Sequence, residues 1–389
     1  MPRISTLRLG IVTNEILEPG LSRLGGFGYA ASSVADVFAA NPQFGVNATI
    51  VACERLNTDS HQTSLTVKGV RVLLRQEHTP AWADALRREA LDLLLCIDYR
   101  SSYDLVLGSR TPAIIWVQDP RTWEDVAHIR TLTVPGSATS DVPGIAYTPT
   151  RGLLRIAVQS VLTGRGIAFP FTSPDLRRKF RSCYGFPPAF RTRVLPFVTA
   201  PTVGPMLKSQ KPLVVFLGRL DPIKRPWIAV ELARAMPDVR VAVLGQNHFP
   251  EAWQPRDPPS NVELVGHVSG EEKAAWLSQG WVLLNSSIHE ALPVSFLEAL
   301  AHEMPIVSCV DPGGIVSSYG LHVPMSAGDG LQTLPAFSAA VRRLVEDRAL
   351  ALRLGQAGRE WVTEHHSLEE FMRALRSLCR VLGVERGTF

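Results

Sequence analysis

The chain has 389 residues, of which 46% are hydrophobic, and its net charge is +4. This length exceeds what one hydrophobic core usually supports, so we expect two domains. No apolar run reaches the roughly 18 residues that a membrane helix needs, and the first ten residues lack the apolar core of a secretory signal. These features argue against an integral membrane protein and predict a cytoplasmic one.

The cysteines and the charges suggest little specialised chemistry. The five cysteines are widely spaced, so we expect reduced structural residues and no metal site. The excess of Lys and Arg lies in residues 1–197 and peaks in one cluster: Arg177, Arg178, Lys179, Arg181, Arg191 and Arg193. This cluster fits peripheral contact with the inner membrane face or an acidic acceptor, and a solvated helix face is the plainer alternative. No motif for nucleic acid is present.

Apolar strand patterns alternate with helical patterns through residues 1–197. Strands are predicted at Leu7–Thr13, Val46–Cys53, Val70–Leu74, Leu93–Ile97, Ala113–Val117 and Ile167–Phe171, with helices such as 28–40 and 82–91 between them. Such alternation predicts a parallel α/β sheet. Ligands of such sheets bind beyond the carboxyl ends of the strands.

A glycine loop precedes the first predicted helix. Residues 26–31 fit the G-x-G-x-x-A pattern of dinucleotide folds, and Glu54 ends the second strand, so an NAD-dependent oxidoreductase is one alternative. About eleven residues separate this pattern from its strand, whereas a dinucleotide fingerprint follows at once. We therefore expect Gly25 and Gly26 to let the backbone approach a substrate closely, with a tight turn as the simpler alternative.

Gln118 and Asp119 follow the strand that ends at Val117 and should face the ligand. Asp119 also suits the cap of a helix that starts near Pro120. Residues 133–150 are rich in Pro, Gly, Ser and Thr, which predicts a long surface loop.

The second half repeats the alternation behind an aperiodic linker at residues 198–210. The strand Leu213–Leu217 leads into a loop that carries Arg219 and Lys224, both suited to phosphate oxygens. Two further strands, at 239–244 and 262–265, end in the loops that begin at Gly245 and Gly266.

Residues 281–314 read as strand, acidic loop, helix, strand and glycine turn. The helix is expected to start near Pro293, which places Glu290 before it and Glu298 one turn inside it. A helix N-terminus attracts phosphate, and flanking carboxylates bind hydroxyls, so a sugar nucleotide would satisfy both. Two solvated acids are the plainer alternative.

The second half resembles a known family. GRLDPIKRP, NVELVGHVS, the E-x7-E pair in HEALPVSFLEALAHEMPIVS, and DPGG together are similar to retaining glycosyltransferases of family four, which have the GT-B fold. The resemblance implies an α/β protein of two Rossmann-like domains facing across a cleft. Its parts would be an acceptor domain at 1–197, a linker at 198–210, a nucleotide-sugar domain at 211–366, and a helix at 367–389 returning to the first domain.

The resemblance also implies site roles. Arg219 and Lys224 would bind the diphosphate, Glu298 the ribose and Glu290 the donor hexose. Further donor contacts would come from Gly25, Gly26, Gly245, Gln246, His267 and Val268.

Two positions depart from the family pattern. Ala291-Leu292-Pro293 replaces a glycine-rich turn, so Val294 and Ser295 must supply the phosphate-binding N–H groups. Gln118 stands where the family commonly has histidine, and with Asp119 it is a candidate for the acceptor or the sugar.

The sequence thus predicts a retaining hexosyltransferase that moves a sugar from an NDP-sugar to a hydroxyl of a glycan, a lipid-linked sugar or a small molecule, as in glycoconjugate biosynthesis. The resemblance implies no metal and no cofactor beyond the NDP-sugar co-substrate. Besides the oxidoreductase, two alternatives stay open: a paired-carboxylate hydrolase and a catalytically silent nucleotide-sugar-binding protein.

Overall fold

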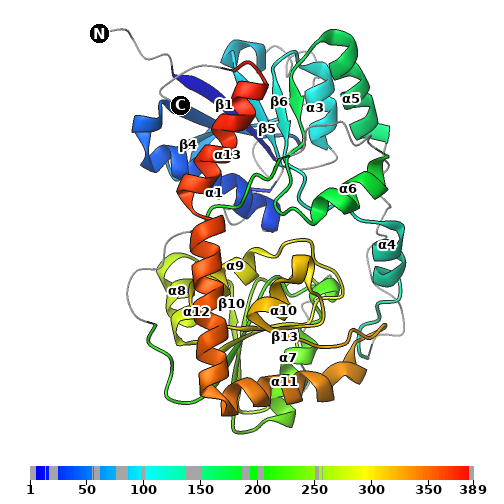
Figure 1. Cartoon of the computed structure of the whole chain (residues 1–389), viewed down its shortest axis with the longest axis vertical. Coiled ribbons are helices and arrows are strands. Elements are labelled where there is room, and N and C mark those ends of the chain that lie inside the picture. The colour runs from blue at the N-terminus through cyan, green and yellow to red at the C-terminus, as the bar shows by residue number, and fades with distance from the viewer. Residues whose placement is uncertain are drawn as a thin grey trace. The chain divides into compact units, whose positions relative to one another are not determined.

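The computed structural model of the chain describes residues 6–13, 15–16, 25–54, 56, 62–75, 86–97, 101–136, 151–185, 193–199, 206–249, 254–255 and 257–384. Contacts divide the chain into two compact units (Figure 1). Unit 1 comprises Met1–Pro120, Thr148–Val198 and Leu368–Phe389, and unit 2 comprises Arg121–Tyr147 and Thr199–Ser367. Each unit contains its own sheet.

Unit 1 is built on a seven-stranded sheet with the order β3-β4-β2-β1-β5-β6-β7. Its strands are β1 (Leu7–Thr13), β2 (Val46–Ala52), β3 (Ser64–Val67), β4 (Val70–Leu73), β5 (Leu93–Cys96), β6 (Ala113–Ile115) and β7 (Ile167–Ala168). All neighbours pair in parallel except β3 and β4, which are antiparallel. The predicted parallel sheet is confirmed, and the β3 strand was not predicted.

Among the described residues of unit 1, the helices with given bounds are α1 (Gly26–Ala40), α3 (Ser101–Gly108), α5 (Arg151–Thr163), α6 (Leu176–Tyr184) and α13 (Leu368–Val381). The last of these packs through Phe371 against Trp116, which also contacts Phe197. The Trp116 indole donates to the Leu195 backbone oxygen at 2.8 Å, so this buried ring has its polar partner. These contacts hold the C-terminal helix in unit 1.

Unit 2 is built on a six-stranded parallel sheet with the order β10-β9-β8-β11-β12-β13. Its strands are β8 (Leu213–Leu217), β9 (Arg240–Leu244), β10 (Val262–Gly266), β11 (Val282–Asn285), β12 (Ile306–Ser308) and β13 (Gly320–His322). The bounds of the first three were predicted within two residues at each end. Because β8 and β11 are neighbours in this order, the loops that follow them leave the sheet side by side.

The helices of unit 2 are α4 (Trp123–Ile129), α7 (Trp227–Ala235), α8 (Gly270–Gln279), α9 (Val294–Ala301), α10 (Ile315–Tyr319), α11 (Leu334–Glu346) and α12 (Arg348–His365). The described part of the chain also contains four short 3-10 segments, at Pro42–Phe44, Pro222–Lys224, Pro312–Gly314 and Leu331–Thr333. None of the helices in the described ranges is long and apolar enough to span a bilayer.

The position of α4 corrects the predicted domain boundary. Residues 1–197 were expected to form one domain, but Arg121–Tyr147 belongs to unit 2. Ile129 and Leu132 are fully buried in the apolar core around β8, β11 and α7. The sequence gives no sign that this segment leaves unit 1 and packs in unit 2. The periodicity of an amphipathic helix shows that one face is buried, but it does not show which sheet buries it.

Lys208 ties the predicted linker to unit 2. Its ammonium donates to the backbone oxygens of Gly280, at 2.8 Å, and His302, at 2.7 Å, which follow the last turns of α8 and α9. Burial lowers the pKa of Lys208 to about 8 despite the nearby carboxylate of Glu303. The lysine thus stabilises two helix ends by satisfying their carbonyl groups.

Candidate active site

The carboxyl ends of β8, β9, β10 and β11 meet at one edge of the unit 2 sheet. The following predicted site residues lie in the loops and helix starts beyond this edge: Arg219, Lys224, Gly245, Gln246, His267, Val268, Glu290, Val294, Ser295 and Glu298. One edge of one sheet therefore carries the whole predicted nucleotide-sugar set of unit 2.

Lys224 and Glu290 form the centre of this edge. The Lys224 ammonium lies 2.5 Å from Glu290 Oε1, and both side chains are largely buried. The same carboxylate oxygen accepts hydrogen bonds from the Ser287 hydroxyl at 2.7 Å and the Asn285 amide at 3.1 Å. The sequence assigned these two residues to different parts of a ligand, whereas they contact each other directly.

This environment fixes the charge of Glu290. Burial by itself would raise the pKa of the carboxyl, but the ammonium of Lys224 and the two hydrogen bonds outweigh burial, and the pKa lies below its ordinary value. Glu290 is therefore an ionised hydrogen-bond acceptor at neutral pH, which disfavours it as a proton-donating acid.

Arg225 positions the loop that carries Lys224. It is fully buried, and its guanidinium donates to the backbone oxygens of Ser286 at 2.8 Å and Ser326 at 3.0 Å. It also lies 3.3 Å from the Cys309 sulfur. Its φ of 47° is unusual for a residue with a side chain, and these contacts hold it there. Arg225 thus joins the ends of β8, β11 and β12.

The helix start predicted near Pro293 is confirmed, because α9 begins at Val294 with Pro293 in extended conformation before it. No side chain of the described residues caps α9. Val294 and Ser295, in its first turn, are only partly buried. This end of α9 keeps the N–H groups and partial positive charge that suit an anion.

Glu298 follows one turn into α9 and pairs with a residue that the sequence analysis missed. Its Oε1 lies 2.5 Å from the ammonium of Lys273 on α8, and both side chains are mostly buried. The Glu298 carboxylate is thereby held at the sheet edge rather than free in solvent. The plainer alternative of two solvated acids does not describe either glutamate.

The loops after β8, β9 and β10 complete the edge. The Arg219 guanidinium lies 3.2 Å from the Asp221 carboxylate. This carboxylate also accepts a hydrogen bond from the backbone N–H of Lys224 at 3.1 Å. The Gly245 N–H donates to the Gly266 oxygen at 2.7 Å, and Gln246 accepts from the Leu220 N–H at 2.8 Å. Val268 is buried and His267 is exposed, so only the former contributes to the packed wall of the edge.

The unit 1 candidates lie at the edge of their own sheet. Gly25 precedes α1, and the Glu15 carboxylate accepts the Gly28 N–H at 3.0 Å. A Cβ at Gly25 would come within 2.5 Å of that carboxylate, whereas Gly26 has open space around it. Glutamate, not an open anion site, therefore faces the first turn of α1.

Gln118 and Asp119 line a small hollow beyond β5 and β6, together with Trp116 and Tyr184. Gln118 is buried, and its side-chain nitrogen has no hydrogen-bond partner among the described residues. Asp119 does not cap the helix that it was expected to start, because α4 begins later and Thr122 caps it through a capping box with Asp125. A buried amide donor without a partner suits a water or a ligand hydroxyl.

Some functional candidates could have been found from sequence. Asn285, Ser286 and Ser287 form a polar run directly after a buried strand, which is a readable signal for the ligand edge. Arg225 and Lys273 give no comparable signal, since their roles depend on partners 61 and 25 residues away.

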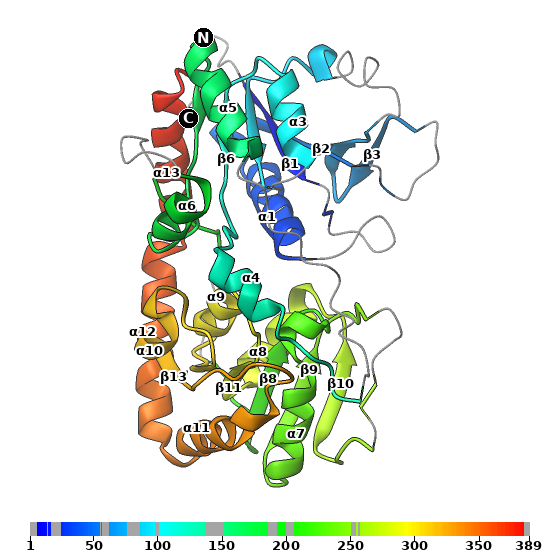
Figure 2. The ribbon, with the colours of Figure 1, turned by 90° about the vertical axis from the view of Figure 1, so that its right-hand side faces the viewer.

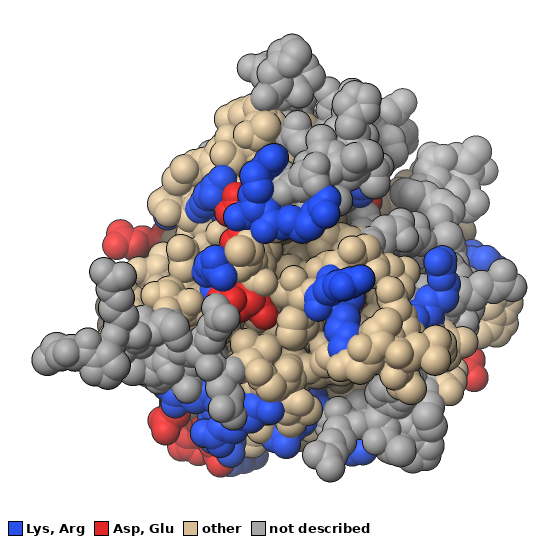
Figure 3. All heavy atoms as spheres, turned by 90° about the horizontal axis from the view of Figure 1, so that it is seen from above, with Lys and Arg blue, Asp and Glu red and all other residues tan. Residues whose placement is uncertain are grey.

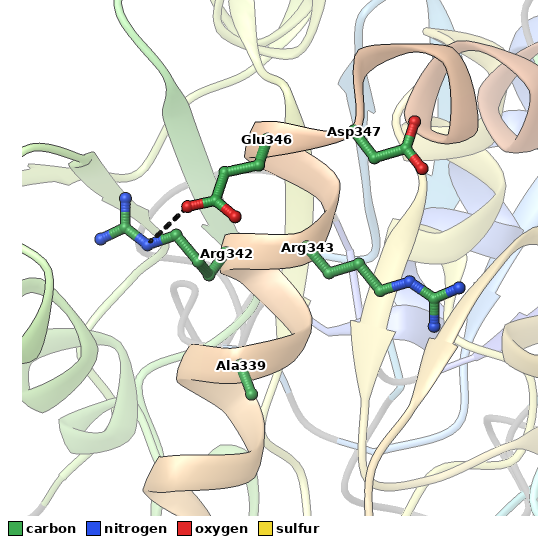
Figure 4. Close-up of a pocket in the computed structure, with 5 residues that line it drawn as sticks. All are labelled: Ala339, Arg342, Arg343, Glu346 and Asp347. Atoms are coloured by element: carbon green, nitrogen blue, oxygen red, sulfur yellow. Dashed lines mark ion pairs between the residues drawn. The ribbon is translucent and has the colours of Figure 1, made fainter.

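Other surface features do not compete with this site. A hollow on α11 is lined by Ala339, Arg342, Arg343, Glu346 and Asp347 (Figure 4). Its Arg342 already pairs with Asp238 and Glu346. No cluster of His, Cys, Asp and Glu in the described residues could hold a metal ion.

Part of the chain matches a known protein family. Residues 205–361 match the model of the family described as glycosyl transferases group 1. Trehalose synthase of Rubrobacter xylanophilus is 26% identical over 197 residues. That alignment covers 45% of this chain and 45% of the relative, so the chain matches less than half the length of that curated protein.

Solved structures resemble nearly the whole chain. Sucrose-phosphate synthase from Thermosynechococcus elongatus has a TM-score of 0.71 at 17% identity, covering 97% of this chain and 99% of its own. Anabaena HepE, solved in complex with UDP and glucose, has a TM-score of 0.67 at 13% identity, covering 96% and 100%. Likeness at this identity establishes the fold.

Proposed function

We propose that this protein, a group 1 glycosyltransferase by the family of its residues 205–361 and by its GT-B fold, moves a hexose from an NDP-sugar to an acceptor hydroxyl. The proposed reaction retains the anomeric configuration and needs no metal ion. The acceptor is a glycan, a lipid-linked sugar or a small molecule.

The observation that carries the proposal is the buried Lys224–Glu290 pair beside the uncapped start of α9. A diphosphate at this helix start would meet N–H groups and the ammonium of Lys224, with Arg219 on the same loop. The Glu290 carboxylate, ionised and already oriented by Ser287, would accept a hydrogen bond from a hydroxyl of the sugar next to that phosphate. The site would thus bind the diphosphate and the sugar hydroxyls side by side.

The proposed catalysis is electrostatic. As the bond from the sugar to the diphosphate loosens, the two cations and the helix start stabilise the charge that grows on the leaving group. The acceptor hydroxyl arrives on the same face of the sugar, and a phosphate oxygen takes its proton. Glu290 binds and orients the sugar, while Glu298, held by Lys273, binds the ribose.

The proposal names the class of donor, a sugar nucleotide, and does not name its base. HepE was solved with UDP and glucose, and its fold likeness makes a uridine donor a reasonable first choice for a screen. The oxidoreductase alternative is disfavoured because the Glu15 carboxylate faces the first turn of α1, where a dinucleotide would place its pyrophosphate.

The test is release of nucleoside diphosphate from a panel of NDP-sugars, with and without acceptors. Arg219→Ala removes a phosphate contact, and we expect turnover to fall by roughly a hundredfold, in line with the loss of an oriented donor to the leaving group. Arg353→Ala, an exposed arginine on α12, is the matched control. Unchanged turnover in Arg219→Ala would contradict the role given to Arg219. Donor binding by the wild type without any turnover would favour the catalytically silent binding protein.

A further inference from the structure

Helix α5 carries an exposed apolar stripe. The described residues hold ten large apolar side chains that are exposed, and four of them lie on this one helix: Leu154, Val158, Val161 and Leu162. Val161 and Leu162 are 74% and 80% exposed. The other six are scattered singly over unrelated elements, as is normal for a soluble surface. Exposed apolar side chains gathered on one helix indicate an interaction surface.

The spacing makes the stripe continuous. Positions 154, 158, 161 and 162 recur at the i, i+4, i+7 and i+8 intervals that share one face of a helix. The opposite face packs into unit 1 through Leu153, Ile156 and Ala157, which are buried. The helix is therefore apolar on two sides, and its outer side is not used by the fold of unit 1.

The charges around the stripe are mainly positive, although Asp175, directly before α6, pairs with Arg178. Arg155 is exposed between Leu154 and Val158. Residues 142–174 contain no Asp or Glu at all. The neighbouring helix α6, which contacts α5 and lies next to it in both Figures 1 and 2, adds the exposed Arg177 and Arg178. Figure 3, which views the molecule from above, shows Lys and Arg in several separate groups, some beside Asp and Glu and others among uncharged residues.

We propose that α5 docks the protein on an anionic lipid surface, with its apolar stripe in the interface and Arg155 and the α6 arginines against the headgroups. An amphipathic helix of this kind lies in the plane of the membrane with its apolar face at the headgroup boundary. Arginines near an anionic leaflet strengthen the attraction, and this part falls with added salt. The proposal does not depend on the sugar-transfer activity.

The charge pattern also decides against a second copy of this chain as the occupant. A symmetric contact through α5 would bring the same surface of both copies together. Arg155 would then face part of the same basic helix of the other copy, and residues 142–174 offer no carboxylate to compensate. Like charges across an interface weaken it. An anionic surface has no such conflict.

The test is cosedimentation of the full chain with vesicles of phosphatidylcholine alone and of phosphatidylcholine mixed equally with phosphatidylglycerol. We expect binding to the anionic vesicles that weakens with salt. Val161→Ser combined with Leu162→Gln should reduce the bound fraction by about tenfold or more, since two exposed apolar groups are lost. The control is Leu207→Gln, which removes a side chain that is 77% exposed in unit 2.

A labelled variant reports the orientation. The five cysteines are all buried, so a thiol introduced by Leu162→Cys can be labelled selectively with a polarity-sensitive dye. Its emission should shift to the blue on anionic vesicles, and that of Leu207→Cys should not. Absence of vesicle binding, equal binding by the stripe variant, or a dimer that the stripe variant dissolves would each overturn the proposal.

Discussion

At the scale of single residues, the Lys224–Glu290 pair defines the proposed site. Glu290→Gln keeps the shape and one hydrogen-bond acceptor but removes the charge that balances Lys224. We expect the free energy of unfolding to fall by about 2 kcal/mol at neutral pH, because a buried pair loses one partner. Because ionised Glu290 stabilises the fold only above its lowered pKa, the difference from wild type should shrink as pH falls below the ordinary value of 4.5.

Urea unfolding of both proteins between about pH 7 and about pH 3 measures this effect. Glu360→Gln, an exposed residue of α12, gives the background for losing one carboxylate. A difference between wild type and Glu290→Gln that stays constant through acid pH would show that Glu290 is not stabilised as a carboxylate.

The sequence predicted the types of residue at this site better than their contacts. Glu290, Glu298 and Lys224 were recognised because loops after parallel strands meet at one edge. Their salt bridges were not, since Lys273 lies on another helix and its reach depends on side-chain rotamers. Arg225 was included in the GRLDPIKRP motif but was given no role of its own, because nothing in the local sequence distinguishes a fully buried arginine from a solvated one.

At the scale of elements, Gly245 shows how the strand ends are locked together. A Cβ built there would lie 1.7 Å from the Gly218 oxygen, which is backbone and cannot move aside. We expect Gly245→Ala to separate the ends of β8 and β9, to destabilise unit 2 by about 2 kcal/mol or more, and to weaken nucleotide binding.

Thermal unfolding and nucleotide titration of Gly245→Ala would check this expectation. Gly108→Ala, at a position with open space around it, is the control and should be close to neutral. Wild-type behaviour of Gly245→Ala in both measurements would mean that the close packing of β8 and β9 is not required.

Most strands were predictable, since short apolar runs bounded by Gly and Pro mark buried parallel strands. The β3 strand was missed because its residues are only half buried or exposed and pair with β4 alone. Residues 82–85 of the predicted helix at 82–91 lie outside the described residues, and residues 86–89 are helical.

At the scale of the whole molecule, the chain forms two α/β units, and connectivity between them was the least predictable feature. Residues 121–136 follow the unit 1 strand β6 in sequence but pack in unit 2, where the Asp125 carboxylate lies 3.5 Å from His289, next to Glu290. The burial of Ile129 and Leu132 in the unit 2 core shows the same packing, and burial against a distant sheet leaves no local pattern in the sequence.

The central claim is that the carboxyl edge of the unit 2 sheet binds a nucleoside diphosphate, with the diphosphate at Arg219 and Lys224 and the ribose at Glu298. Calorimetric titration with UDP, GDP and inorganic pyrophosphate tests it most directly. We predict that Glu298→Gln weakens the preferred nucleotide by roughly tenfold and leaves pyrophosphate unchanged, while Arg219→Ala weakens both. Failure of the wild type to bind either nucleotide, or equal binding by Glu298→Gln, would contradict the account.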